Sequence, residues 1–295
     1  MHTLEQLRAG QLAGATRLDL AAGLTEFPRE ILDLADTLEV LNLSGNRLRA
    51  LPADFSRLRK LRVLFCSDNP FEEVPAVLGQ CPELSMVGFK ACRIRTLPAA
   101  ALPPRLRWLI LTDNQLQALP PEIGRCQQLQ KLMLAGNQLS TLPAELAQCA
   151  NLELLRLAAN RLRELPAWLL HMPRLSWLAY AGNAFADRSE AAVLARHPSR
   201  PVPWAELTPH EQLGEGASGV IVRATWHPQG QPAREVALKL FKGAVTSDGL
   251  PRSEMDACLS AGRQPHLIGV EGRVLGHPTG AAALVLPLID PAYRT

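Results

Sequence analysis

Leucine recurs at short, regular intervals through the first two thirds of the chain. Four segments repeat one another closely: LEVLNLSGNRLRALP from Leu38, LRWLILTDNQLQALP from Leu106, LQKLMLAGNQLSTLP from Leu129 and LELLRLAANRLRELP from Leu152. Alternate leucines in the first half of each segment would face the same way, as on a short β-strand with one buried side. The pattern therefore predicts a series of similar units, each beginning with a strand.

An asparagine follows the strand of each unit and gives the period of the repeat. The asparagines are Asn46, Asn69, Asn114, Asn137, Asn160 and Asn183, spaced by 23 residues except for one interval of 45, in which Cys92 takes the same position. A weaker first copy starts near Arg17, with Gly23 in the asparagine position. The pattern L-x-x-L-x-L-x-x-N/C-x-L at this period resembles the leucine-rich repeat. The resemblance implies an α/β solenoid, the leucine-rich-repeat horseshoe, with eight stacked copies.

The residues that flank the inward leucines would point outward onto the concave side of such a solenoid. Solvated faces of this kind are usually polar, but here seven positions carry large apolar side chains: Phe65, Met86, Trp108, Ile110, Met133, Leu154 and Trp177. Trp108 and Trp177 stand three repeats apart, about 15 Å at one strand spacing per repeat. An exposed patch rich in Trp, Met and Phe is typical of a binding site. We expect a protein segment to dock here with the two tryptophans as anchors. The alternative is a patch that is covered internally.

The cysteines predict a core role rather than a metal site. The six cysteines form no Cys-x-x-Cys pair and never combine with the seven histidines at metal-ligand spacing. Cys81, Cys126 and Cys149 share one position of the repeat, which Leu58 occupies in an earlier copy. We interpret them as small core residues with reduced thiols, which favours a cytoplasmic protein. A disulfide between Cys126 and Cys149 is the alternative, and it would require an oxidising compartment.

The repeat decays after Asn183. Residues 184–196 are expected to form a helical cap, with Ala191, Leu194 and Ala195 at helical spacing. Residues 197–203 read His-Pro-Ser-Arg-Pro-Val-Pro, which cannot hold a helix and suits a semi-rigid linker. We therefore assign residues 1–196 to a repeat domain with a cap at each end, residues 197–203 to a linker and residues 204–295 to a second domain.

The second domain begins with a glycine motif, G-x-G-x-x-G, in the segment from Leu213 to Ile221. A dinucleotide-binding fold would continue from the glycines into a helix, but here a strand-like run ending at Trp226 follows. A Walker phosphate loop is excluded because no Lys-Ser/Thr follows the glycines. A second strand carries Lys239, which stands 20 residues beyond Gly219. A glycine loop between two strands, with a lysine on the second, is typical of a protein kinase.

Residues 204–295 thus resemble the N-terminal lobe of the protein kinase family, a small α+β domain with a five-stranded antiparallel sheet and one helix. The resemblance implies that Lys239, in the segment Val236-Ala-Leu-Lys239, contacts the α- and β-phosphates of ATP. Glu254, in a helical stretch from residue 251 to 261, is its expected partner. Asp256 is a lesser candidate, because the spacing from Glu254 to residues 264–268 is one residue longer than usual. The full implied ATP site is Leu213, Gly214, Glu215, Gly216, Ala217, Ser218, Gly219, Ile221, Ala237, Lys239, Glu254 and Leu286.

The family's catalytic base and Mg²⁺ ligands lie in H-R-D-x-x-x-x-N and D-F-G segments, which this sequence does not contain. In the family these segments follow the hinge, which the run from Leu284 to Asp290 resembles. We therefore expect a catalytic base only beyond Thr295, with ATP and Mg²⁺ as the family's cofactors and the Mg²⁺ ligands absent here. Phosphoryl transfer depends on positioning and charge neutralisation, so this chain alone should be essentially inactive.

Two functions from different classes remain open. The first is a leucine-rich-repeat protein kinase that transfers the γ-phosphate of ATP to protein Ser/Thr or Tyr and is represented here only to its hinge. The second is a non-catalytic module that binds a protein partner on the apolar concave face. A net charge of +3, with the basic residues scattered, predicts no nucleic-acid partner. No apolar run reaches the roughly 18 residues of a membrane span, so no membrane partner is expected.

Overall fold

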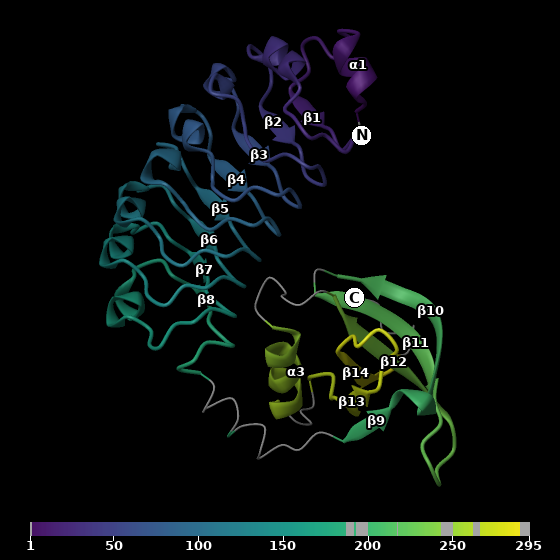
Figure 1. Ribbon diagram of the computed structural model, residues 1–295. Helices are drawn as coiled ribbons and strands as arrows, with labels where there is room; N and C mark the ends of the chain where they lie inside the picture. Colours follow the sequence, from purple (N-terminus) through teal and green to yellow (C-terminus); the bar gives the residue numbers. More distant parts are fainter. Residues whose placement is uncertain are drawn as a thin grey trace. The chain divides into compact units, whose positions relative to one another are not determined.

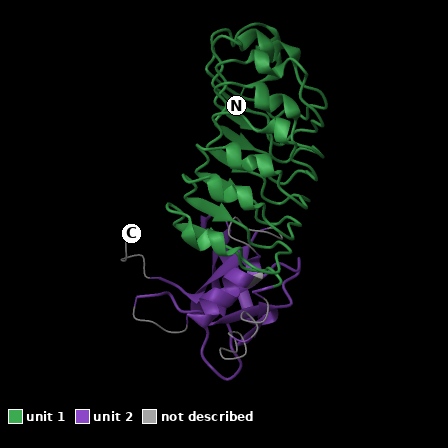
Figure 2. Cartoon of the chain, turned by 90° about the vertical axis from the view of Figure 1, so that its left-hand side faces the viewer, with its two compact units in different colours: residues 1–184 green, residues 185–295 purple. Residues whose placement is uncertain are grey.

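The computed structural model describes residues 2–186, 192, 200–216, 218–242, 250–261 and 266–289. The chain divides into two compact units, Met1–Ala184 and Phe185–Thr295, which are coloured separately in Figure 2. Each unit contains its own β-sheet.

The first unit is a curved stack of short parallel strands, one in each repeat (Figure 1). Within the described residues its sheet has eight strands in chain order, each in parallel register with the next. The strands are β1 (Arg17–Asp19), β2 (Val40–Asn42), β3 (Val63–Phe65), β4 (Met86–Gly88), β5 (Trp108–Ile110), β6 (Lys131–Met133), β7 (Leu154–Arg156) and β8 (Trp177–Ala179). The predicted eight-copy solenoid is confirmed.

Short 3-10 helices connect the strands along the outer side of the curve (Figure 1). They are η1 (Arg29–Leu34), η2 (Phe55–Arg57), η3 (Ala76–Gln80), η4 (Ala99–Ala101), η5 (Pro121–Arg125), η6 (Ala144–Gln148) and η7 (Ala167–His171). All but η2 have a proline at the N-cap, whose ring fixes φ and turns the chain out of the repeat's extended segment. Helix α1 (Leu4–Arg8) precedes β1 and is closed by a capping box between Thr3 and Gln6.

Stacking removes the inward side chains of the repeats from water. The central residues of β2 to β7 are all 2% exposed or less, whereas Leu178, in the last strand, is only half-buried. A single repeat has one leucine face and nothing to cover it, so burial depends on the neighbouring copies.

A buried asparagine ties each of six repeats to the one before it. Asn137 donates from Nδ2 to the carbonyl oxygens of Leu111 (2.8 Å) and Leu134 (3.0 Å) and accepts from the N–H of Leu116 at 2.9 Å. The carbonyl of Leu111 also accepts from Asn114, its own repeat's asparagine, at 3.0 Å. The same pattern recurs at Asn46, Asn69, Asn114, Asn160 and Asn183. The result is a chain of polar contacts inside an apolar stack, broken only where Cys92 replaces the asparagine.

One contact in this chain is weak, and the backbone beside each contact has an unusual conformation. Cys92, in the asparagine position, keeps only a weak link to the previous repeat, with its Sγ 3.4 Å from the carbonyl oxygen of Cys66. The residue just before the asparagine or Cys92 has a positive φ in every copy from β2 to β8. Glycine fills this place in some copies, but Ala91 and Ala159 adopt it at φ 52° and 54°, at a cost of about 1 kcal/mol each.

The cysteines of the repeat column are core residues. Cys81, Cys126 and Cys149 are buried, and all six cysteines of the chain are free thiols. Burial raises the pKa of Cys126 to about 11, and the pKa values of Cys81 and Cys149 to about 12. The structure thus contains buried thiols rather than the alternative Cys126–Cys149 disulfide. Of the predicted helical cap, Ala191, Leu194 and Ala195 lie outside the described residues.

The second unit is built on a mixed sheet with the order β10-β11-β12-β14-β13-β9. Its strands are β9 (Pro201–Pro203), β10 (Leu207–Glu215), β11 (Gly219–Trp226), β12 (Arg234–Phe241), β13 (Gly272–Leu275) and β14 (Ala283–Pro287). A 3-10 turn η8 (Trp204–Glu206) follows β9, and helix α3 (Pro251–Ser260) lies between β12 and β13 in the chain. All the pairings are antiparallel except that of β9 with β13.

Strand β9 corrects the expected five-stranded sheet and the expected linker. Residues 201–203 form a sixth strand at the sheet edge rather than a spacer. Val202 is fully buried, while its flanking prolines are exposed at an edge where no ladder N–H is needed from them. Gly272 permits the approach, because a Cβ there would lie 2.6 Å from the carbonyl oxygen of Arg200.

Each face of this sheet covers a separate apolar core. Trp226, Val236 and Leu238 belong to one core together with Val202 of β9. On the other face, Phe241 and Leu284 pack with Met255 of helix α3. Helix α3 is therefore held against the side of the sheet that Ala237, Lys239 and Phe241 share by alternation along β12.

We predict that Asn137→Ala lowers the free energy of unfolding of the first unit by about 1–3 kcal/mol, because the buried Leu116 N–H loses its acceptor. The matched control is Asn151→Ala, which removes one exposed hydrogen bond to the Gln127 carbonyl oxygen and should cost less than about 1 kcal/mol. Urea unfolding followed by circular dichroism would measure both. Equal losses in the two variants would contradict the role given to the buried asparagines.

Candidate functional site

The outward strand positions of the first unit form two rows, which together we call the concave face. The central residue of each strand points into the stack, so its two neighbours point to the other side. In register, the first row is Arg17, Val40, Val63, Met86, Trp108, Lys131, Leu154 and Trp177. The second row is Asp19, Asn42, Phe65, Gly88, Ile110, Met133, Arg156 and Ala179.

All seven apolar residues singled out in the sequence lie on this face, but they differ in exposure. Trp177 is 53% exposed. The other six are half-buried: Phe65, Met86, Trp108, Ile110, Met133 and Leu154. Phe65 shows how neighbours cover one another, since its ring reaches across Gly88, where an added Cβ would lie 2.7 Å from Phe65 Cδ1. The face is therefore a close-packed apolar surface and not a set of separately protruding side chains.

Basic side chains lie over both tryptophan rings. The Lys131 Nζ is 3.9 Å from the centre of the Trp108 ring, one strand away in the same row. The guanidinium carbon of Arg156 lies 5.8 Å from the Trp177 ring. Distances of this kind are typical of cation–π contacts. The sequence analysis missed these pairs because it considered the apolar positions alone.

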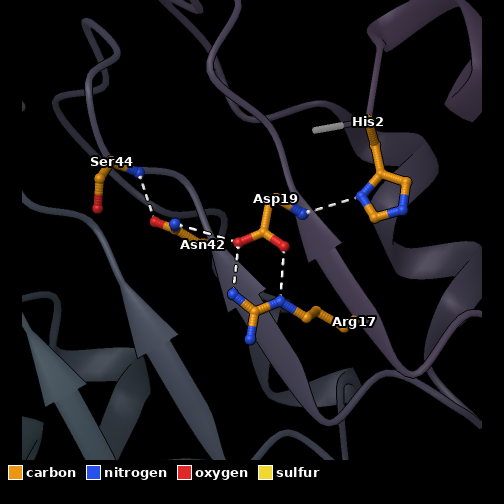
Figure 3. Close-up of polar contacts among 5 residues, drawn as sticks. All are labelled: His2, Arg17, Asp19, Asn42 and Ser44. Atoms are coloured by element: carbon orange, nitrogen blue, oxygen red, sulfur yellow. Dashed lines mark hydrogen bonds and ion pairs between the residues drawn. The ribbon is translucent and has the colours of Figure 1, made fainter.

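The N-terminal end of the concave face is polar and internally paired (Figure 3). Arg17 donates to both carboxylate oxygens of Asp19, at 2.6 and 2.9 Å, and Asn42 donates to Oδ1 at 3.2 Å. The Arg17 hydrogen bond holds the pKa of Asp19 below its usual range. His2 Nδ1 accepts from the Asp19 N–H, and Ser44 N–H donates to Asn42. The charges at this end satisfy each other, so the apolar part of the face begins beyond it.

The glycine loop of the second unit joins β10 to β11. Gly214 and Glu215 pair with Ile221 and Val220 on the two strands, and the Gly216 N–H donates to the Gly219 carbonyl at 2.9 Å. Ala217 lies outside the described residues. Glu215 forms an ion pair with Lys242, and this contact lowers the pKa of Glu215. Leu213, at the start of the loop, is 49% exposed.

The three glycines of the loop have different surroundings. A Cβ on Gly219 would lie 2.4 Å from the Leu240 carbonyl oxygen, so this glycine is required by the packing of β11 against β12. Around Gly214 and Gly216 the space is open to 4 Å, and neither has a positive φ. None of the described residues therefore requires glycine at these two positions.

Lys239 and Glu254 form an ion pair between β12 and helix α3. Their side chains are 20% and 31% exposed. Ser218 of the glycine loop donates to the same Glu254 Oε1 at 3.4 Å. The structure thus brings together the lysine, the glutamate named as its expected partner and one residue of the loop. The lesser candidate, Asp256, is not the residue that pairs with Lys239 here.

The remaining apolar residues of the implied ATP site lie on the same sheet face. Ile221 is opposite Lys239 across the β11–β12 pair, and Ala237 is opposite Leu286 across the β12–β14 pair. Ala237 is buried, while Ile221 and Leu286 are half-buried. These side chains form an apolar strip beside the ion pair. Such a surface suits a ligand that has a flat ring next to an anionic group.

Two further observations concern metal binding and membrane-spanning helices. No group of three or more His, Cys, Asp or Glu side chains among the described residues is arranged to hold a metal ion. In the part of the chain that the structure describes, no helix is both long and apolar enough to cross a bilayer.

Comparisons with known proteins identify the repeats. Family models for the leucine-rich repeat match residues 37–58 and the overlapping segments 104–162 and 127–185. Human leucine-rich repeat and calponin homology domain-containing protein 1 is 32% identical over 126 residues, 41% of this chain and 17% of that protein. Probable serine/threonine-protein kinase pats1 of Dictyostelium discoideum is 37% identical over 121 residues, 38% of this chain and 4% of that protein. The chain carries leucine-rich repeats and spans only a small part of these relatives.

Among solved structures, the plant peptide hormone receptor RGFR1 in complex with RGF2 matches 60% of this chain and 30% of its own, with a TM-score of 0.51 at 27% identity. The two matching family models both describe leucine-rich repeats, and neither extends beyond residue 185. The comparisons therefore support an interaction module, and they add no support for phosphoryl transfer.

We predict that Gly219→Ala destabilises the second unit by about 1–3 kcal/mol, because the new methyl group meets backbone that cannot move aside. Gly216→Ala is the matched control, and the open space around it should keep the change below about 0.5 kcal/mol. Hydrogen exchange of peptides covering β11 and β12 would report both. Similar exchange rates in the two variants would show that the loop glycines are not distinguished by packing.

Proposed function

We propose that this chain is a leucine-rich-repeat interaction module that binds an extended segment of a partner protein on its concave face. One observation carries the proposal. The outward positions from β3 to β8 bring seven large apolar side chains together on one sheet face, with a tryptophan near each end of its C-terminal half.

Such a face gains stability when it is covered. Burying apolar surface contributes roughly 25 cal/mol per Å² removed from water, and Trp177 alone still has more than half of its surface to bury. Tryptophan also loses little conformational freedom on binding and is enriched among the residues that dominate interface energetics. The half-buried residues around the tryptophans are already packed, so a partner would meet a preorganised surface.

The comparisons support this kind of function. The receptor structure that matches this chain is a complex with RGF2. That likeness supports a polypeptide ligand for this chain, while the identity of any ligand depends on side chains that differ between the two proteins.

The test replaces the anchors. The double variant Trp108→Ala/Trp177→Ala should weaken partner binding by at least about tenfold, since each ring is a central contact. Leu170→Ala is the matched control, because Leu170 is 79% exposed on η7, on the outer side of the curve. Quantitative affinity purification from the source cells would compare wild type with both variants. A set of retained proteins that is unchanged in the double variant would contradict the proposal.

A second candidate function concerns the second unit, which we propose binds a purine nucleotide such as ATP. The Lys239–Glu254 pair favours it, because a strand lysine held by a helix glutamate matches the phosphate-contacting lysine of the kinase resemblance. The open space at Gly214 and Gly216 leaves room for a phosphate to lie close to the backbone of the glycine loop. When bound, ATP would supply a transferable phosphoryl group, but this chain's own residues would only hold and orient it.

Lys239→Met should abolish nucleotide binding, whereas Lys60→Met, an exposed lysine of the first unit, should leave it unchanged. Binding is expected to be weak, with a dissociation constant above about 10 µM, because only one wall of a kinase site is proposed here. Isothermal calorimetry with Mg²⁺ and a non-hydrolysable ATP analogue would measure it. Submicromolar binding that survives Lys239→Met would remove this lysine from the site.

A further inference from the structure

The charges of the concave face are distributed unevenly along the solenoid. At the N-terminal end, Arg17 is neutralised by Asp19 within the same strand. The outward positions of β5 to β8 carry two basic residues, Lys131 and Arg156, and no acidic residue. The apolar half of the face that contains both tryptophans is therefore also its basic half.

The charge and surroundings of Lys131 indicate the chemistry of a partner. Its ammonium group lies over the Trp108 ring, and no carboxylate among the described residues forms an ion pair with it. An ammonium group has three N–H donors, and the ring takes only the side that faces it. The other donors point away from the ring, so a partner can bind the charge without displacing it from Trp108.

The chemistry of this group favours a carboxylate over a phosphate. Phosphorylated side chains are usually bound by clusters of arginine, whose planar fork binds two oxygens at once, and a single phosphate-binding lysine usually acts beside the backbone N–H groups of a glycine loop. Lys131 is a single ammonium on an apolar row, flanked by Trp108 and Leu154 on the neighbouring strands. A carboxylate between apolar side chains satisfies such a position, since the surrounding rings and methyl groups exclude water and strengthen the charge contact.

We infer that the concave face selects an extended peptide segment in which an acidic residue stands between apolar residues, with its carboxylate on Lys131. This inference rests on the proposed function of the face. Trp108 and Trp177 are three strand spacings apart, about 15 Å, which an extended peptide spans with about five residues. The segment would place one apolar side chain against each tryptophan and the acidic residue nearer to Trp108.

The experiment starts from a display library of random twelve-residue peptides selected on the purified full chain. Enriched peptides would be synthesised with a fluorescent label, and their dissociation constants measured by anisotropy. We expect a shared core of about five residues containing Asp or Glu among apolar residues. Lys131→Met retains the length and apolar stem of the side chain and should weaken binding about three- to tenfold. Lys60→Met, the same exchange away from the face, should have no effect.

Two further readouts separate the inference from the proposed function. Raising the salt concentration should weaken wild-type binding, and this salt dependence should be smaller in Lys131→Met. Enriched peptides that lose binding with Trp177→Ala but lack an acidic residue, or that tolerate Lys131→Met, would overturn the inference and leave the interaction module standing. A library that yields no enriched peptide, or peptides unaffected by Trp108→Ala/Trp177→Ala, would contradict the proposed function itself.

Discussion

The buried asparagines of six repeats make the contacts on which the first unit depends. Each amide group has backbone partners in its own repeat and in the previous one, and the inner leucine carbonyls accept from two successive asparagines. A polar group inside an apolar stack is tolerated only when it is fully paired, so neighbouring repeats are fixed in one register. That register places equivalent positions of neighbouring repeats side by side. Apolar residues at one position of successive repeats therefore form a continuous surface.

Much of the solenoid follows from the sequence, because its information is local and repeated. The 23-residue spacing gives the strands, the inward leucines and the outward direction of residues such as Trp177. What could not be predicted depends on neighbours in space. The cover of Phe65 requires Gly88 on the next strand, and the cation over Trp108 comes from another repeat. The positive φ of Ala91 is likewise imposed by the turn, since alanine itself does not favour that conformation.

In the second unit, a sequence motif gave candidate residues but not their separate roles. Three glycines in one motif look alike in the sequence, yet packing requires only Gly219 and leaves Gly214 and Gly216 with open space. The pairing of Lys239 with Glu254 joins a strand to a helix across 15 residues of chain. Spacing alone left two acidic candidates on that helix, and only the packing of α3 on the sheet distinguishes them.

Strand β9 changes where the second unit begins. The proline-rich stretch suggests a spacer that separates two independent binding modules, but residues 201–203 are part of the second sheet, with Val202 buried in its core. The folded part of the second unit therefore begins earlier in the chain than the composition indicates. A second unit that began at residue 204 would lose this edge strand and would uncover the apolar core that Val202 shares with Trp226 and Val236.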